Sequence, residues 1–214
     1  MESNIKDFLG SSPTANNIAK YLTRLAELTT ASNSLVPEVK SYPDVVYFNY
    51  HKLGLSLQFS PRNGYKPARG LRREELRDEG LVLDGIDIYN IPEGRATKPG
   101  GTSSRSAEVA FSTHPRSPLV IPVETVSSGR SVIHVAANTT GKELVGWLGE
   151  PSRKGGGAGP SSGSIGIWCE WSKAGMMIEF GGEEARGAQA WERGKDAVWK
   201  VITIFAPQTD AVDG

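Results

Sequence analysis

The feature that most constrains this chain is an internal repeat. Residues 44–59 read DVVYFNYHKLGLSLQF and residues 165–180 read IGIWCEWSKAGMMIEF. Each string has a glycine near its middle, Gly54 in the first and Gly175 in the second. Aligning the two glycines also brings other identical or similar residues into register: Lys52 with Lys173, Tyr50 with Trp171 and Phe59 with Phe180. Strand-forming residues on both sides of a central turn predict an antiparallel β-hairpin in each copy.

The residues around the first hairpin predict a helix, a charged connection and another strand. Ser12 followed by Pro13 is typical of a helix start, and apolar residues recur at helical spacing after it, which predicts a helix over 13–29. Segment 61–80 interleaves arginines with carboxylates, which favours a solvated, salt-bridged helical turn over a phosphate site. The expected strands are 45–50, 55–59 and 81–89.

The second copy predicts the same order of elements. Thr140 and Glu143 fit a capping box, so a helix is expected over 141–148. Segment 154–163 is rich in glycine and serine and is interpreted as a flexible insertion of about nine residues relative to the first copy. The strands expected in this copy are 132–135, the hairpin of 165–171 and 176–180, and 197–205.

These elements predict an α+β fold of two tandem repeats, each a helix packed on a small antiparallel sheet. The expected organisation places the first repeat at 1–92 and the second at 131–207. Between them, 93–130 is interpreted as a Gly/Ser/Pro-rich linker with one short apolar run, and 208–214 as a flexible tail.

Composition narrows the classes of protein and partner. Lys and Arg together number 24, as do Asp and Glu, so a net basic field for nucleic acid is missing and we expect no nucleic-acid partner. Cys169 is the single cysteine, which excludes an internal disulfide framework. No apolar run is long enough to span a bilayer, and the N-terminus lacks a signal-peptide pattern, so a cytoplasmic location is expected.

Two family resemblances follow from these motifs. A capped helix ending in Leu-Gly-x-Pro, then an aromatic before a glycine turn and a closing phenylalanine, resembles the β-lactamase-inhibitor-protein-like and small-protein-A-like families. The residues that carry this resemblance are Thr140, Glu143, Leu148, Gly149, Glu150, Pro151, Trp171, Gly175 and Phe180. The string Phe48-Asn49-Tyr50-His51-Lys52-Leu53-Gly54, with Phe59, resembles the repeats of the eukaryotic phagophore assembly factor family.

The resemblances imply a tandem of helix-on-sheet units whose uncovered sheet face binds another protein. The second family implies a partner complex near a phospholipid membrane, which adds autophagy or membrane trafficking as a process and peripheral membrane contact as an expectation. Two positive charges, Arg153 and Lys154, precede the glycine run, but two charges alone give little membrane affinity.

Strand alternation predicts which residues form the binding face. If Leu55, Leu57 and Phe59 point at the helix, their neighbours point to the opposite face of the sheet. The resulting candidate partner-binding residues are Tyr47, Asn49, Gln58, Trp168, Glu170, Met177 and Glu179. Aromatic side chains on such a face are typical of protein interfaces. An alternative is that these aromatics are buried between the two sheets or under the linker.

No stretch carries a specific catalytic, cofactor or metal signature, and none is expected. Gly159–Gly163 matches the nucleophile pattern G-x-S-x-G, but no histidine follows it in the chain. Cys169 is expected on the core side of its strand, where cysteine is usually a small buried hydrophobe. The sequence therefore favours a non-enzymatic adaptor. The alternatives are a small hydrolase or transferase using Glu170, Glu179 or His134 between the repeats, and a structural subunit that forms a homodimer.

Overall fold

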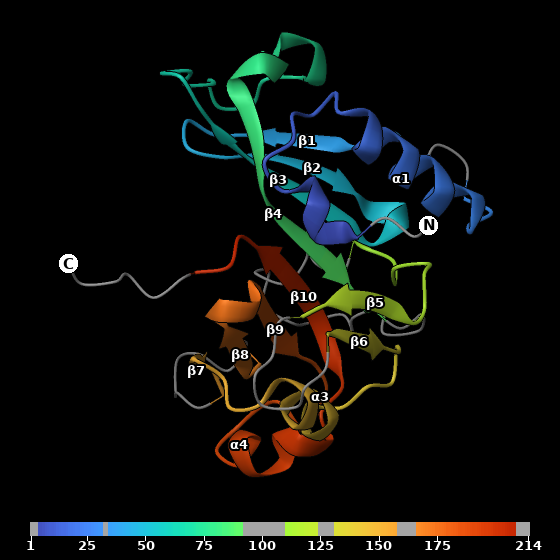
Figure 1. Cartoon of the computed structure of the whole chain (residues 1–214), viewed down its shortest axis with the longest axis vertical. Coiled ribbons are helices and arrows are strands. Elements are labelled where there is room, and N and C mark those ends of the chain that lie inside the picture. The colour runs from blue at the N-terminus through green and yellow to red at the C-terminus, as the bar shows by residue number, and fades with distance from the viewer. Residues whose placement is uncertain (1–3, 32–33, 92–109, 124–130, 158–165, 209–214) are drawn as a thin grey trace, which may run out of the picture. The chain divides into compact units, whose positions relative to one another are not determined.

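The computed structural model describes residues 4–31, 34–91, 110–123, 131–157 and 166–208 of the 214-residue chain (Figure 1). The fold is α+β with antiparallel strand pairing throughout the described residues. The chain divides into two compact units, Met1–Arg116 and Ser117–Gly214. Among the described residues, four strands of each unit, β1–β4 in the first and β7–β10 in the second, follow one another as an antiparallel meander.

Over its described residues, the first unit has one α-helix, four strands and several 3-10 turns. Its strands are hydrogen-bonded in the order β1, β2, β3, β4. The elements are η1 (Ile5–Phe8), α1 (Asn16–Glu27), β1 (Glu38–Ser41), β2 (Val46–Tyr50), η2 (His51–Leu53), β3 (Leu55–Pro61), η3 (Arg73–Glu75), η4 (Asp78–Gly80) and β4 (Leu81–Tyr89).

Helix α1 lies within the range expected from the sequence but starts three residues later. Pro13 falls inside a turn in which the Ala15 amide donates to the Ser12 carbonyl at 3.1 Å. Ser12 is therefore used to close this turn and does not cap the helix, whose N-cap position is Ala15. The expected apolar stripe was Ile18, Leu22, Leu25 and Leu28 or Thr29, and its first three members are buried. Leu28 is 59% exposed and follows the end of the helix, so the expectation was wrong there, and Tyr21 is buried with the stripe instead.

The inner face of the first sheet forms the core of the unit. Leu55, Leu57 and Phe59 are all buried, as the alternation predicted. Phe48 of β2 packs against Phe59 with ring centroids 4.9 Å apart, and the guanidinium of Arg73 lies 4.9 Å from the centre of the Phe48 ring. The charged connection is indeed a pair of salt-bridged turns, and it also covers an aromatic ring of the core.

The second unit has the same meander preceded by a separate two-stranded ribbon. Its sheet has the order β10, β9, β8, β7, and the ribbon pairs β5 with β6. The elements are β5 (Leu119–Pro122), β6 (Val132–Val135), α3 (Gly141–Leu148), β7 (Arg153–Gly155), β8 (Trp168–Trp171), η6 (Ser172–Ala174), β9 (Met176–Phe180), α4 (Ala190–Arg193), η7 (Gly194–Asp196) and β10 (Trp199–Phe205).

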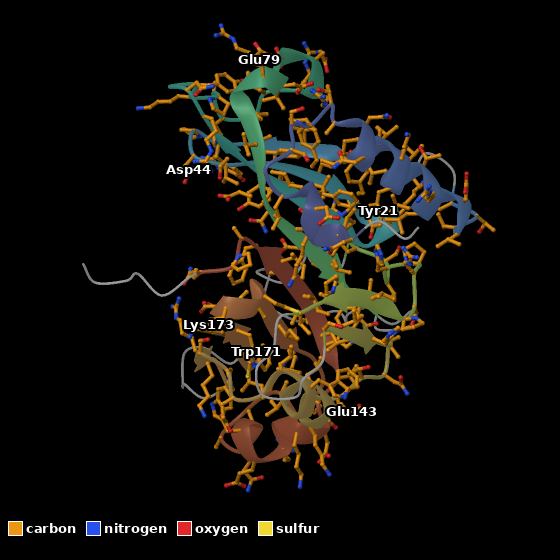
Figure 2. All side chains as sticks on the ribbon, viewed as in Figure 1. Tyr21, Asp44, Glu79, Glu143, Trp171 and Lys173 are labelled. Atoms are coloured by element: carbon orange, nitrogen blue, oxygen red, sulfur yellow. The ribbon has the colours of Figure 1, made fainter. Side chains whose placement is uncertain are left out.

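Helix α3 begins and ends at the residues expected from the sequence. Its capping box is present, with the Thr140 amide donating to the Glu143 carboxylate at 2.8 Å. At the other end, the Trp171 indole N–H donates to the Gly149 carbonyl at 2.9 Å, which joins the helix end to the hairpin. Glu143 and Trp171 are both labelled in Figure 2.

The central hairpins of the two units have the same register and the same turn. Tyr50 pairs with Leu55 and Trp171 pairs with Met176. Each turn is a short 3-10 segment closed by a glycine in the left-handed region, with φ 54° at Gly54 and φ 60° at Gly175. The last strand of each meander then donates to the glycine carbonyl at 2.9 Å, from the amides of Tyr89 and Phe205.

Two edge strands, β1 and β7, were not expected from the sequence. Glu38 pairs with Asn49, and Arg153 pairs with Glu170, so the two strands occupy equivalent positions in their sheets. Segment 154–163, interpreted as a flexible insertion, therefore starts inside a strand. Glu38 lies 12 positions before Tyr50 (50 − 38) and Arg153 lies 18 before Trp171 (171 − 153). The second copy thus carries six extra residues, and the expected nine was wrong.

The span 93–130, interpreted as a linker, contributes described residues to both units. Phe111 and His114 are buried in the first unit, and residues 119–122 form β5 in the second. Residues 93–109 and 124–130 of this span lie outside the described residues, as do 209–214 of the expected tail and Gly159–Gly163 of the nucleophile-like pattern. Among the helices described, none has the length and apolar character needed to cross a membrane.

Candidate interaction faces

Each sheet has an outer face, opposite the apolar core, and the candidate binding residues lie on these faces. In the first unit, cross-strand pairing places Asn49 opposite Ser56, and Tyr47 opposite Gln58. In the second unit it places Trp168 opposite Glu179, and Glu170 opposite Met177. The strands thus bring the seven candidates together in two groups, one on each unit, which we call the first outer face and the second outer face.

The first outer face is polar and held by side-chain hydrogen bonds. The Ser56 hydroxyl donates to Asn49 Oδ1 at 2.7 Å, and both side chains are buried. Gln58 Nε2 donates to Asp87 Oδ2 at 2.7 Å across the pair β3–β4. Gln58 also lies over Gly85, where an added Cβ would sit 3.3 Å from its side-chain amide carbon. These bonds fix Asn49 and Gln58 before any partner arrives.

Tyr47 is the aromatic residue of the first outer face and is half-buried. Its ring packs edge-on against Tyr42, with centroids 6.3 Å apart. Burial raises the pKa of the Tyr47 phenol above its ordinary value, and the nearby carboxylates of Asp87 and Asp44 raise it further. Asp44 is exposed and is labelled in Figure 2. At neutral pH the phenol is therefore a hydrogen-bond donor in acidic surroundings.

The second outer face has two carboxylates, and each is paired with a basic residue. Arg153 Nη1 lies 3.5 Å from Glu170 Oε2, and the Ser172 hydroxyl donates to Glu170 Oε1 at 2.6 Å. Lys200 Nζ lies 3.1 Å from Glu179 Oε1. Glu170 is 8% exposed, so it is held almost fully inside this network. Both carboxylates are thereby positioned and largely neutralised.

Trp168 and Met177 provide the apolar surface of the second outer face. Both are half-buried, so part of each side chain reaches solvent. The Trp168 indole lies across β7 at Gly155, where an added Cβ would be 2.6 Å from the ring. The glycine therefore makes room for the indole beside the backbone of β7. An aromatic side chain and a methionine surrounded by paired charges resemble the apolar centre and polar rim of a protein interface.

Sequence reasoning missed the basic residues that complete the second outer face. Arg153 lies in the unexpected strand β7, which has only three residues and so shows no periodicity. Lys200 lies in an expected strand, β10, but a register irregularity between Trp199 and Val201 changes which side chains meet β9. The pairing of Arg153 and Lys200 with these carboxylates could not be predicted from residue types alone. The partner-binding role of the seven candidates stays a prediction.

The residues considered for catalysis lie in structural surroundings. Cys169 is buried, and burial raises the pKa of its thiol to about 11, which disfavours the nucleophilic thiolate. His134 is an exposed residue of β6. Within the described part of the chain, no group of three or more His, Cys, Asp or Glu residues is arranged to hold a metal ion.

Comparison with protein-family models, with curated proteins and with solved structures finds no match to this chain.

Proposed function

We propose that the chain is a non-enzymatic cytoplasmic adaptor built from two copies of one helix-on-sheet repeat, whose outer sheet faces contact another protein. The equivalent hairpins support the duplication, since Gly54 and Gly175 close the same turn and receive the same hydrogen bond from the last strand. The equivalent pairing of β1 and β7 supports it further.

The observation that carries the binding proposal is the half-buried Trp168, whose indole lies against Gly155 on the second outer face beside paired charges. Glu170 and Glu179 already have basic partners at 3.5 and 3.1 Å, so covering them costs less desolvation than covering free carboxylates. Trp168 and Met177 supply apolar surface, and its removal from water on binding is favourable. A partner that presents apolar and hydrogen-bonding groups fits this surface. The family resemblances add autophagy or membrane trafficking as the process to examine.

Affinity purification of the full chain, followed by mass spectrometry, tests this proposal. We expect Trp168→Ala to lose the partner, because interface tryptophans commonly contribute about 2 kcal/mol or more to binding. The matched control is Trp191→Ala, since Trp191 is 43% exposed on the short helix α4 and is not one of the outer-face residues. Each variant is first checked by thermal unfolding, so that a loss of fold is recognised.

The recovered partner is then purified and its affinity measured directly for wild type, Tyr47→Ala and both tryptophan variants. The proposal expects at least about 10-fold weaker binding for Trp168→Ala and unchanged binding for Trp191→Ala. No reproducible partner, or equal binding by the two tryptophan variants, would contradict it.

A further inference from the structure

Residues 111–114 of the first unit form a short segment that returns to the central hairpin, and we call it the return segment. The Ser112 amide donates to the His51 carbonyl at 2.8 Å, and the His114 amide donates to the Tyr89 carbonyl at 2.8 Å. The Thr113 hydroxyl donates to the Ile91 carbonyl at 2.6 Å. The segment is therefore tied by main-chain bonds to both the hairpin turn and the end of β4.

Two side chains of the return segment are buried. Phe111 stacks on Tyr89, with centroids 3.8 Å apart and planes 7° from parallel, and also contacts the His51 ring at 4.3 Å. His114 is 3% exposed. These contacts hold the return segment against the hairpin turn. Within the return segment, His114 is the most deeply buried polar side chain.

The surroundings of His114 fix it as a neutral imidazole. Its Nδ1 lies 3.0 Å from the Leu53 carbonyl, which can only accept, so Nδ1 carries the proton. Its Nε2 lies 3.4 Å from the hydroxyl of Tyr21 on α1, which can donate to it. Figure 2 labels Tyr21. Helix, hairpin turn and return segment thus meet at one ring.

The described groups that face His114 either disfavour a second proton on the ring or stabilise the charged ring less than burial destabilises it. The Tyr21 phenol from α1 is neutral, since burial raises its pKa well above the ordinary value. The turn offers the Leu53 carbonyl, which favours the charged ring, and the segment's own chain offers Arg116, which disfavours it. No carboxylate among the described residues is one of the groups that shift the pKa of His114. Glu38 instead binds the neighbouring histidine, with its Oε2 2.6 Å from His51 Nε2.

We propose that the return segment is an acid-released strap, which detaches from the hairpin turn when His114 takes up a proton. Charging a ring enclosed by the helix, the turn and its own segment requires the ring to reach water. Release would expose Phe111, Tyr89 and the peptide groups around Gly54. The proposal is independent of the proposed function, because it concerns the first unit alone.

The direction and size of the effect follow from proton linkage. Burial, with a smaller contribution from Arg116, lowers the pKa of His114 from 6.5 to about 4. Closure is therefore fully stabilised above pH 6.5, and this stabilisation is lost as the pH falls from 6.5 towards 4. With these two values, the opening equilibrium constant rises about 20-fold between pH 7 and pH 5.

The second unit supplies an internal control. There the Gln208 amide donates to the Ser172 carbonyl at 2.9 Å, and Ser172 occupies the position equivalent to His51. Neither residue titrates near neutral pH, so the bond at Gln208 should not respond to acid in the same way.

Amide hydrogen exchange on the full chain at pH 7 and pH 5, corrected for intrinsic exchange rates, tests the strap. We expect opening at Ser112 and His114 to increase about 20-fold on acidification, while opening at Gln208 stays within about 3-fold. The His114→Gln variant should lose this pH dependence, and His51→Gln should keep it. Equal responses at Ser112 and Gln208, or a pH response that survives in His114→Gln, would overturn the proposal.

A second measurement keeps the test decisive if His114→Gln does not fold. The imidazole ring of His114 in the wild-type protein is titrated by NMR. We expect no titration near pH 6.5 while the strap is closed, and a titrating ring signal at that pH with Ser112 still protected would refute the mechanism.

Discussion

The two hairpin glycines give the sharpest prediction about stability. Gly54 has φ 54°, a conformation that L-residues adopt with strain, and an added Cβ would lie 2.6 Å from the His114 amide nitrogen and closer still to the Ser112 carbonyl oxygen. Gly175 has the same conformation, and an added Cβ would collide with the Phe205 carbonyl oxygen. In both positions the obstacle is backbone, which cannot turn aside as a flexible side chain can.

The magnitude can be worked out from these contacts. Alanine in the left-handed region costs about 1 kcal/mol, and about half of this is offset because alanine restricts the unfolded chain. The collision must also displace the return segment, which breaks the bonds from Ser112 to His51 and from His114 to Tyr89, each worth about 1 kcal/mol. We therefore expect Gly54→Ala to lower the free energy of unfolding by about 2.5 kcal/mol.

Urea unfolding followed by far-ultraviolet circular dichroism and by tyrosine fluorescence measures the effect, because all six tyrosines lie in the first unit and all five tryptophans in the second. The chain also offers matched controls. Gly64 and Gly187 have φ 75° and 79°, but an added Cβ at either would meet no heavy atom within 4 Å. Their alanine variants should pay only the conformational part, about 0.5 kcal/mol. If Gly54→Ala and Gly64→Ala agree within about 0.5 kcal/mol, the close approach of the return segment to the turn is not what requires glycine.

Two further predictions concern the second unit. Thr140→Ala removes the hydroxyl of the capping box at the start of α3. It should lower the free energy of unfolding in urea denaturation by about 1 kcal/mol, whereas Thr140→Ser should retain most of the wild-type stability. Equal values for the two variants would contradict the capping role. Cys169 should react with a thiol reagent at pH 8 at least about 100-fold more slowly in the native protein than in urea, because burial raises the pKa of its thiol to about 11. A native rate within about 10-fold of the unfolded rate would show that the thiol is accessible.

The elements that could be predicted from the sequence are those whose signals are local. The capping box of Thr140 and Glu143 marked the start of α3, and alternation placed Leu57 and Cys169 on the core side of their strands. The cap expected at Ser12 was wrong because Ser12 accepts a turn hydrogen bond from Ala15 instead. Several residue types fit such positions equally well, and the choice between them depends on the path of the neighbouring chain.

The non-local parts of the candidate faces could not be predicted. Glu170 and Glu179 were expected on the outer side of the second sheet, but their ion pairs depend on Arg153 and Lys200, which lie in strands brought alongside by folding. A three-residue strand such as β7 has no period to detect. The burial of His114 is likewise absent from any sequence pattern, since its neighbours come from α1 and the hairpin turn.

The unequal lengths of chain before the two returns explain why the first is so heavily packed. Between Tyr89 and Ser112 lie the 22 residues 90–111, whereas only Ala206 and Pro207 separate Phe205 from Gln208. Closing the longer stretch costs about 2 kcal/mol more in chain entropy. The stacked Phe111 ring offsets this cost, while the short return in the second unit makes its bond from an exposed Gln208. The length of the intervening chain thus sets how much anchoring each return requires.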